Sequence, residues 1–145
     1  MSVKNQPKSS RMKQNQKIKE KIARRYLHLL SDGDTEKIIA LFSKNGIVNS
    51  PLYGKKRADE FYDLLGIATI SSALAFKKIF RSTNSIEIAL YFEYTWTVKS
   101  GKTVVFDVVD IIKFDHENKI QELTIVYDTA ITRKLLEQMK KMGPH

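Results

Sequence analysis

The sequence predicts an α+β fold in which helices pack on one face of a curved antiparallel sheet. Two observations predict it. Apolar residues recur at helical spacing three times between residues 16 and 65, and four runs with apolar residues at alternate positions follow between residues 74 and 128. Helical spacing indicates amphipathic helices, and strict alternation indicates strands with one buried face. Helices followed by a run of strands are typical of the α+β class.

The first helix is expected from about Gln16 to Ser31. Its apolar residues share one stripe, which comprises Ile18, Ile22, Tyr26, Leu29 and Leu30. Tyr26 therefore faces inward and His28 lies on the opposite side. Gly33 predicts the end of this helix, since glycine commonly follows a helix C-terminus.

Two shorter helices and one extended segment follow. Asp34 is expected to cap a helix over residues 35–43. Residues 46–50 read as an extended segment, because Pro51 forces the residue before it into an extended conformation. A third helix is expected over residues 56–65.

The remainder of the chain reads as a sheet closed by a helix. Residues 66–72 are expected to form a loop. Strands are predicted at 74–81, 85–98, 102–114 and 119–128, and a last helix at 130–141. The pair Ser100-Gly101 lies between two alternating runs and predicts a hairpin turn.

Composition excludes several classes of function. The chain has no cysteine, and its three histidines, His28, His116 and His145, are too scattered to predict a metal site. No apolar run approaches the length of about 18 residues that a membrane span needs, and the N-terminus lacks the apolar core of a signal peptide. We expect a cytoplasmic protein without a cofactor.

The positive charge is concentrated at the N-terminus. Residues 1–25 hold nine basic residues and one Glu, whereas the remaining residues hold 16 basic and 15 acidic ones. We expect residues 1–14 to be a disordered basic arm and residues 15–142 to form one domain. Because such arms are usually solvated, the sequence does not predict a nucleic-acid partner.

Asp110 is the residue most indicative of function. It shares a strand face with Val104, Phe106, Val108, Ile112 and Phe114, so a carboxyl group projects from an otherwise apolar surface. An ionised carboxylate there would be costly, so Asp110 is expected to be protonated or hydrogen-bonded. It is either a functional carboxylic acid or a buried residue satisfied by a tyrosine or a backbone N–H.

Two segments resemble one protein family. The first runs from Tyr26 through the Gly-Asp pair at 33–34 to Ser50-Pro51, and the second is the Asp-Val-Val-Asp strand ending at Asp110. Together they resemble the ketosteroid isomerase and SnoaL-like polyketide cyclase branch of the nuclear transport factor 2-like superfamily. The resemblance implies a cone-shaped barrel with cystatin-like architecture that encloses an apolar pocket.

The resemblance also implies roles for individual residues. Tyr26 and Asp110 match the tyrosine and protonated aspartic acid that form the oxyanion hole of ketosteroid isomerases. The base of these isomerases is an aspartate immediately before a proline, and this chain has Ser50 there. A serine hydroxyl cannot remove a proton α to a carbonyl at neutral pH without its own base. In SnoaL-like cyclases an aspartate from the sheet is the acid/base, a role that Asp110 could fill with Tyr26 as partner.

Asn49 suggests a further alternative function, the hydrolysis of an epoxide. It resembles the Asn-x-Pro of limonene epoxide hydrolases, although residues 86–98 lack the arginine that their relay needs. Asp128 is a distant second acid/base candidate, and helix capping is its expected role. The residues expected to line the pocket are Asn49, Ser50, Phe61, Tyr62, Phe92, Tyr94, Trp96, Val108, Leu123 and Tyr127.

An aromatic lining suits a small, flat, apolar carbonyl compound such as a polycycle or terpenoid. The reaction would be isomerisation or cyclisation through an enol. Alternatively the aromatics only fill the core, and the protein is a non-catalytic binder of a ligand or of another protein. The outer sheet face is also partly apolar and predicts a homodimer. Its apolar residues are Ala89, Tyr91, Val105, Val109, Ile111 and Val126.

Overall fold

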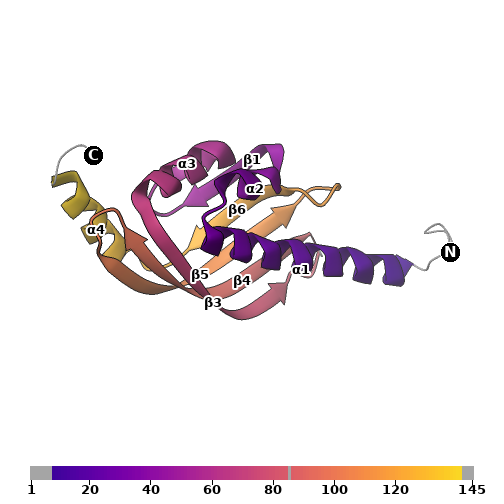
Figure 1. Cartoon of the computed structure of the whole chain (residues 1–145). Coiled ribbons are helices and arrows are strands. Elements are labelled where there is room, and N and C mark those ends of the chain that lie inside the picture. The colour runs from indigo at the N-terminus through magenta and orange to yellow at the C-terminus, as the bar shows by residue number, and fades with distance from the viewer. Residues whose placement is uncertain (1–7, 85, 142–145) are drawn as a thin grey trace.

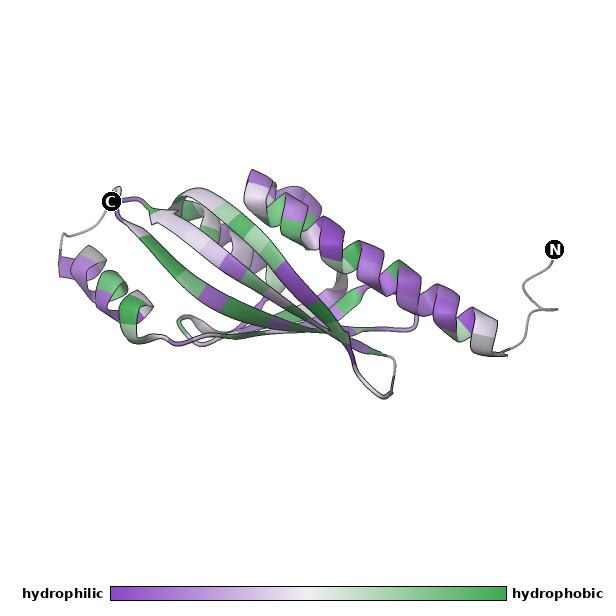
Figure 2. Cartoon of the chain, turned by 90° about the horizontal axis from the view of Figure 1, so that it is seen from below, coloured by the Kyte–Doolittle hydropathy of each residue, from purple (hydrophilic) through white to green (hydrophobic). Residues whose placement is uncertain are grey.

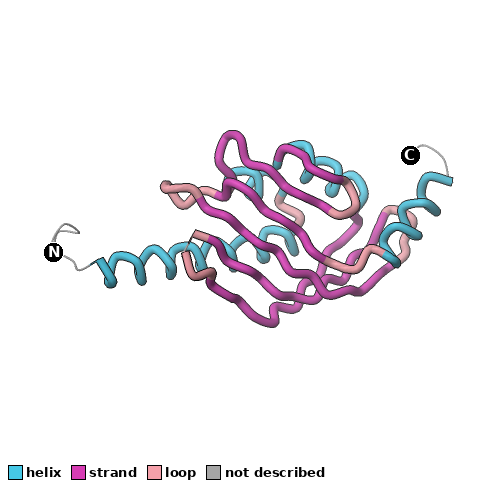
Figure 3. Tube along the Cα trace, turned by 180° about the vertical axis from the view of Figure 1, so that it is seen from behind, coloured by secondary structure: helices cyan, strands magenta, loops and turns pink. Residues whose placement is uncertain are grey.

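A strongly curved six-stranded sheet forms one layer of the molecule, and three helices lie against its concave face (Figures 1 and 3). The computed structural model describes residues 8–84 and 86–141. The elements in chain order are α1 (Lys8–Asp32), α2 (Thr35–Ala40), β1 (Phe42–Ser50), β2 (Gly54–Arg57), α3 (Ala58–Ala68), β3 (Thr69–Arg81), β4 (Glu87–Val98), β5 (Thr103–Phe114), β6 (Ile120–Val126) and α4 (Ala130–Lys141). The predicted α+β class is confirmed.

Helix α1 is longer than the sequence predicted. It begins at Lys8, so residues 8–14, expected to be disordered, are helical; residues 1–7 lie outside the described part. This stretch contains no glycine or proline, and its Lys, Arg, Met and Gln residues favour helices even where no apolar stripe marks them. The end of the helix is as predicted, with Gly33 at a φ of +68° and the Asp34 carboxylate accepting a hydrogen bond from the Lys37 N–H.

Strand β1 corrects two predictions. The helix expected over 35–43 ends at Ala40, because Phe42 already belongs to β1, and the sheet is not wholly antiparallel, because β1 pairs parallel with β6. The sheet order is β2-β1-β6-β5-β4-β3. A parallel pairing between segments more than 70 residues apart leaves no local turn signal. Gly46 permits this packing, since a Cβ there would come within 2.8 Å of the Phe42 ring.

The segment around α3 was also predicted wrongly. The loop expected at 66–72 does not form: α3 continues to Ala68 and β3 begins at Thr69. Strand β2, which pairs antiparallel with β1, was missed and occupies the start of the predicted third helix. Pairing of β3 with β4 stabilises the extended conformation despite the turn-forming Gly66 and serines, and the Trp96 indole N–H donates to Thr69 Oγ1 at 2.8 Å.

The hairpin of β4 and β5 forms as predicted, and it lies between β6 and β3 in the sheet. Every second residue of β4 is buried, and Gly101 has a φ of +89° in the connecting turn. Asp110 lies opposite Leu90 on the buried face of β5. Helix α4 covers the residues predicted for it and buries Leu135. Among the described helices, none combines the length and the apolar character that crossing a membrane requires.

Candidate functional site

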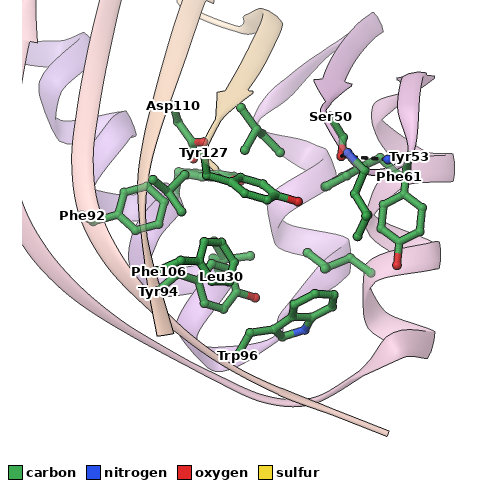
Figure 4. Close-up of a pocket in the computed structure, with 15 residues that line it drawn as sticks. Leu30, Ser50, Tyr53, Phe61, Phe92, Tyr94, Trp96, Phe106, Asp110 and Tyr127 are labelled. Carbon is green, nitrogen blue, oxygen red and sulfur yellow. Dashed lines mark hydrogen bonds between the residues drawn. The ribbon is translucent and has the colours of Figure 1, made fainter. Parts of the chain in front are cut away.

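A cavity lies between the helices and the concave face of the sheet. Aromatic side chains fill most of the space and leave a narrow cavity with a volume of about 50 Å³. Figure 4 shows Phe92, Tyr94 and Phe106 on one side and Ser50, Tyr53 and Phe61 on the other, with Tyr127 reaching between them. Its lining consists of Tyr26, Leu30, Ser50, Leu52, Tyr53, Phe61, Leu65, Phe92, Tyr94, Trp96, Phe106, Val108, Asp110, Ile125 and Tyr127.

Asp110 contributes the only carboxyl group of this lining. Its side chain projects from β5, and the residue is 2% exposed. Burial raises the pKa of Asp110 to about 8, because a carboxylate would lose its hydration there. Its Oδ1 is buried and has no hydrogen-bond partner in the described part of the chain. At neutral pH the cavity therefore contains a protonated carboxylic acid that is free to hydrogen-bond a ligand.

Tyr26 reaches the same cavity from α1. Its hydroxyl lies 2.7 Å from the hydroxyl of Tyr62 on α3, and either oxygen can be the donor. We expected Tyr26 to hydrogen-bond Asp110 directly, but no such bond forms between these residues. Burial raises the pKa of Tyr26 well above its usual value, and the nearby Tyr62 and Asp110 raise it further. Tyr26 is therefore a neutral phenol at neutral pH.

Ser50 ends β1 at the side of the cavity opposite β4. Its Oγ accepts hydrogen bonds from the backbone N–H groups of Leu52 at 3.2 Å and Tyr53 at 3.1 Å. The hydroxyl thus stabilises the turn that follows Pro51. No basic side chain contacts this hydroxyl in the described residues, so Ser50 has no group to activate it as a base.

The remaining polar groups of the lining belong to aromatic residues. Tyr94 hydroxyl lies 2.6 Å from the Ser72 hydroxyl, and burial raises the pKa of Tyr94 to about 12. The ring of Phe106 stacks on Tyr94 with centroids 5.6 Å apart and contacts Tyr127 at 4.8 Å. These rings form a continuous apolar wall that would contact the faces of a flat ligand.

The structure brings most of the predicted pocket residues together. Tyr26, Ser50, Phe61, Phe92, Tyr94, Trp96, Val108, Asp110 and Tyr127 all line the cavity. Three predicted residues do not. Asn49 donates to Glu122 Oε2 at 2.7 Å and to Thr124 Oγ1 at 3.1 Å, Tyr62 lies behind Tyr26, and Leu123 is fully buried in the core.

Sequence reasoning did not place Leu30, Leu52, Tyr53, Leu65, Phe106 and Ile125 in the pocket. Phe106 could have been found, because it shares the alternating face of Asp110. Leu30 also lies on the inward stripe of the first helix. Leu52 and Tyr53 carried no signal, since they lie in the irregular segment after Pro51, whose position only the folded chain decides.

The structure also places the secondary candidates. The Asp128 carboxylate accepts a hydrogen bond from the Ala130 N–H at 3.0 Å at the start of α4, which is a capping contact. His28 and His116 are exposed, and His145 lies outside the described residues. Within the part of the chain that the structure describes, no three His, Cys, Asp or Glu residues are grouped so that they could hold a metal ion.

Comparisons with known proteins identify the fold. No protein-family model matches the sequence, and a search of curated proteins finds no match. Among solved structures, PrhC from Penicillium brasilianum NBRC 6234 superimposes with a TM-score of 0.74 at 12% identity, covering 88% of this chain and 91% of that one. A putative SnoaL-like polyketide cyclase from Shewanella putrefaciens CN-32 gives a TM-score of 0.64 at 13% identity, covering 83% and 86%.

A third similar structure is SalBIII, an epoxide hydrolase/cyclase-like enzyme described as acting in pyran ring formation in the polyether salinomycin. It gives a TM-score of 0.68 at 14% identity, covering 77% of this chain and 92% of that one. Further similar structures are described as nuclear transport factor 2-like and ketosteroid isomerase-like. This protein therefore has the nuclear transport factor 2-like fold.

Proposed function

We propose that the cavity binds a small, flat, apolar compound through its carbonyl oxygen, with Asp110 and Tyr26 as hydrogen-bond donors. The observation that carries the proposal is the buried, unpartnered Oδ1 of Asp110 inside an aromatic cavity. A buried polar atom without a partner costs about 1–3 kcal/mol, which a ligand that completes the hydrogen bond recovers. Because the cavity is narrow and its walls are aromatic, its ligand is expected to be a planar polycycle or a terpenoid.

The reaction that fits this site is isomerisation or cyclisation through an enol. Protonated Asp110 would transfer its proton to the carbonyl oxygen, and the resulting carboxylate would accept the proton lost from the α carbon, so that the enol forms without a second base. Tyr26 would add a second donor if Tyr62 supplies the proton of their shared hydrogen bond. The likeness to a putative SnoaL-like polyketide cyclase supports cyclisation as one form of this chemistry.

A non-catalytic ligand-binding protein is the second candidate. The observation that favours it is the environment of Ser50, whose Oγ is occupied by two backbone N–H groups and contacts no base. The cavity lining then contains two groups that can donate a proton, Asp110 and Tyr26, but no separate group that could remove a proton from a substrate. Epoxide-hydrolase-like activity has less support, because Asn49 is engaged with Glu122 and Thr124 outside the lining; that alternative rests on likeness to SalBIII alone.

We also propose that a second copy of the chain covers the outer sheet face. Cross-strand partners place Ala89 beside Ile111, and Val109 beside both Tyr91 and Val126, so the apolar residues form one continuous patch. Within this patch, Ile111 and Val126 are 37% and 50% exposed. Contiguous exposed apolar surface is typical of an interface, and a two-fold axis lets one patch cover its own copy.

Titration with 2-naphthol tests the cavity proposal, because a planar phenol mimics an enol oxygen. Binding is measured by calorimetry, and the emission of Trp96, the single tryptophan and a lining residue, reports the site. Asp110→Leu is expected to weaken binding about 10- to 100-fold, by loss of one hydrogen bond to a buried group. The exposed Asp63→Leu serves as control. Equal binding by folded Asp110→Leu, or no binding by the wild type, contradicts the proposal.

A further inference from the structure

Helix α1 carries positive charge that the rest of the protein lacks. It spans 25 residues, or roughly 37 Å. Its N-terminal half extends beyond the sheet (Figures 1 and 2), and Arg81 at the end of β3 contacts that half at Gln16 and Glu20. Lys8, Arg11 and Lys13, which we expected on a disordered arm, are therefore part of a helix.

The cations of α1 are ordered along one side. Lys13, Lys17 and Lys21 recur every four residues, and Arg24 and Arg25 continue the row by one further turn. All five residues are exposed. Residues four apart on a helix lie one above another at intervals of about 6 Å. We call these five residues the basic stripe; it extends over about 18 Å.

Burial of the opposite side of α1 fixes the orientation of the basic stripe. Ala23, Tyr26 and Leu27 are buried against the sheet and α3, which fixes the rotation of the helix about its axis. Lys13, Lys17, Lys21 and Arg25 are therefore exposed on the side of α1 away from these buried residues, whereas Arg24 lies against Phe76 of β3. Cations that are already positioned lose less conformational entropy on binding than cations on a flexible tail.

The charge of the stripe is not neutralised within the chain. Glu20, on the flank of α1, pairs instead with Arg81 of β3 at 2.8 Å. In residues 8–84 and 86–141, no carboxylate lies within 4.0 Å of the charged groups of the stripe. Arg24 contacts the ring of Phe76, with its guanidinium carbon 4.5 Å from the centroid.

The residue types in and around the basic stripe favour one kind of anionic partner over others. Among the described residues the stripe contacts one aromatic ring, that of Phe76, whereas a single-stranded ligand is held by several rings on which successive bases stack. Insertion into a membrane needs a continuous exposed apolar helix face, and in its described part α1 exposes only two large apolar side chains, those of Met12 and Ile18. A row of lysines and arginines is suited to the closely spaced phosphates of a double helix.

We propose that the basic stripe of α1 binds the phosphate backbone of duplex nucleic acid without reading its sequence. This surface is separate from the cavity and independent of the function proposed for it. With four phosphate contacts, the slope of log K against log salt concentration would be about −3 to −4. Affinity would then fall roughly 100-fold between 50 and 200 mM salt.

The test measures fluorescence anisotropy of a labelled 24-base-pair DNA of arbitrary sequence with the full chain at 50–200 mM KCl. The stripe variant carries Lys13→Gln, Lys17→Gln, Lys21→Gln and Arg25→Gln. The matched control carries Lys44→Gln, Lys55→Gln, Lys78→Gln and Lys134→Gln, all exposed and without ion pairs in the described residues. Both variants lose four charges from the formal net charge of +9, so they differ only in where charge is removed.

We expect the stripe variant to bind at least about 10-fold more weakly at 50 mM KCl, with a salt slope close to zero. The control should keep the wild-type slope. Circular dichroism and 2-naphthol binding verify that both variants are folded. Equal weakening in the control overturns the proposal, as does the absence of duplex binding by the wild type. It is also overturned if the wild type binds vesicles of phosphatidylcholine and phosphatidylserine but not the duplex.

Discussion

The hydroxyl of Tyr26 on α1 lies 2.7 Å from the hydroxyl of Tyr62 on α3, and both side chains are almost completely buried. This hydrogen bond joins the two helices behind the cavity. It also determines what Tyr26 can offer a ligand: when Tyr62 donates to Tyr26, the Tyr26 proton is free to point at the cavity.

Tyr62→Phe is expected to destabilise the protein by about 1–3 kcal/mol, because it leaves the Tyr26 hydroxyl buried without its partner. Tyr26→Phe should have a similar cost. Since the double variant has no orphaned hydroxyl, its destabilisation should be less than the sum of the two. Denaturant unfolding of the three variants measures this, and strict additivity would show that the bond contributes no coupling energy.

Asp110 predicts a dependence of stability on pH. Its pKa is about 8 in the folded protein and near 4 in the unfolded chain, so the folded state retains the proton over the interval between these values. Stability from this group is therefore complete below pH 4 and declines as the pH rises towards 8, by up to about 1.4 kcal/mol per pH unit. Unfolding free energies at pH 5–8 measure it.

Asp110→Asn, which cannot ionise, should remove that decline. The exposed Asp63→Asn should retain it. A wild-type pH profile parallel to that of Asp110→Asn would mean that Asp110 is ionised or solvated in the folded protein, contrary to the arrangement described above.

Position 50 offers a gain-of-function prediction. Ser50→Asp should introduce measurable isomerisation of a Δ5-3-ketosteroid, because it supplies a carboxylate base at the edge of a cavity that already contains two acids. An aspartate oxygen can also accept the N–H groups of Leu52 and Tyr53 that Ser50 now accepts. Ser50→Asn is the control, since it preserves these contacts without a base. If folded Ser50→Asp is no more active than Ser50→Asn, the cavity is not arranged as in an isomerase.

The outer sheet face predicts self-association. We expect the wild type to sediment as a dimer and Ile111→Glu to sediment as a monomer, because a charge within the apolar patch would be desolvated on association. Ile131→Glu on α4 replaces an equally apolar residue, 54% exposed, outside the patch. A monomeric wild type at micromolar concentration, or dimers of Ile111→Glu, would contradict this interface.

The sequence by itself determined the hairpin of β4 and β5 and the placement of Asp110. Every second residue of these strands is apolar apart from Asp110, and a period of two then decides which side chains face the core. The same logic applied to α1 placed Tyr26 inward. These features depend on neighbours along the chain, whose spacing the sequence displays directly.

Only the tertiary structure decided how these elements combine. The parallel pairing of β1 with β6 and the extension of β3 to Thr69 depend on partners distant in sequence, which local propensity does not reveal. The partner of Tyr26 proved to be Tyr62 because α1 and α3 cross behind the cavity, not because of any spacing between them. The length of α1 was missed for the complementary reason: its first two turns bury no apolar face, and helix-forming residues without a pattern resemble a disordered arm.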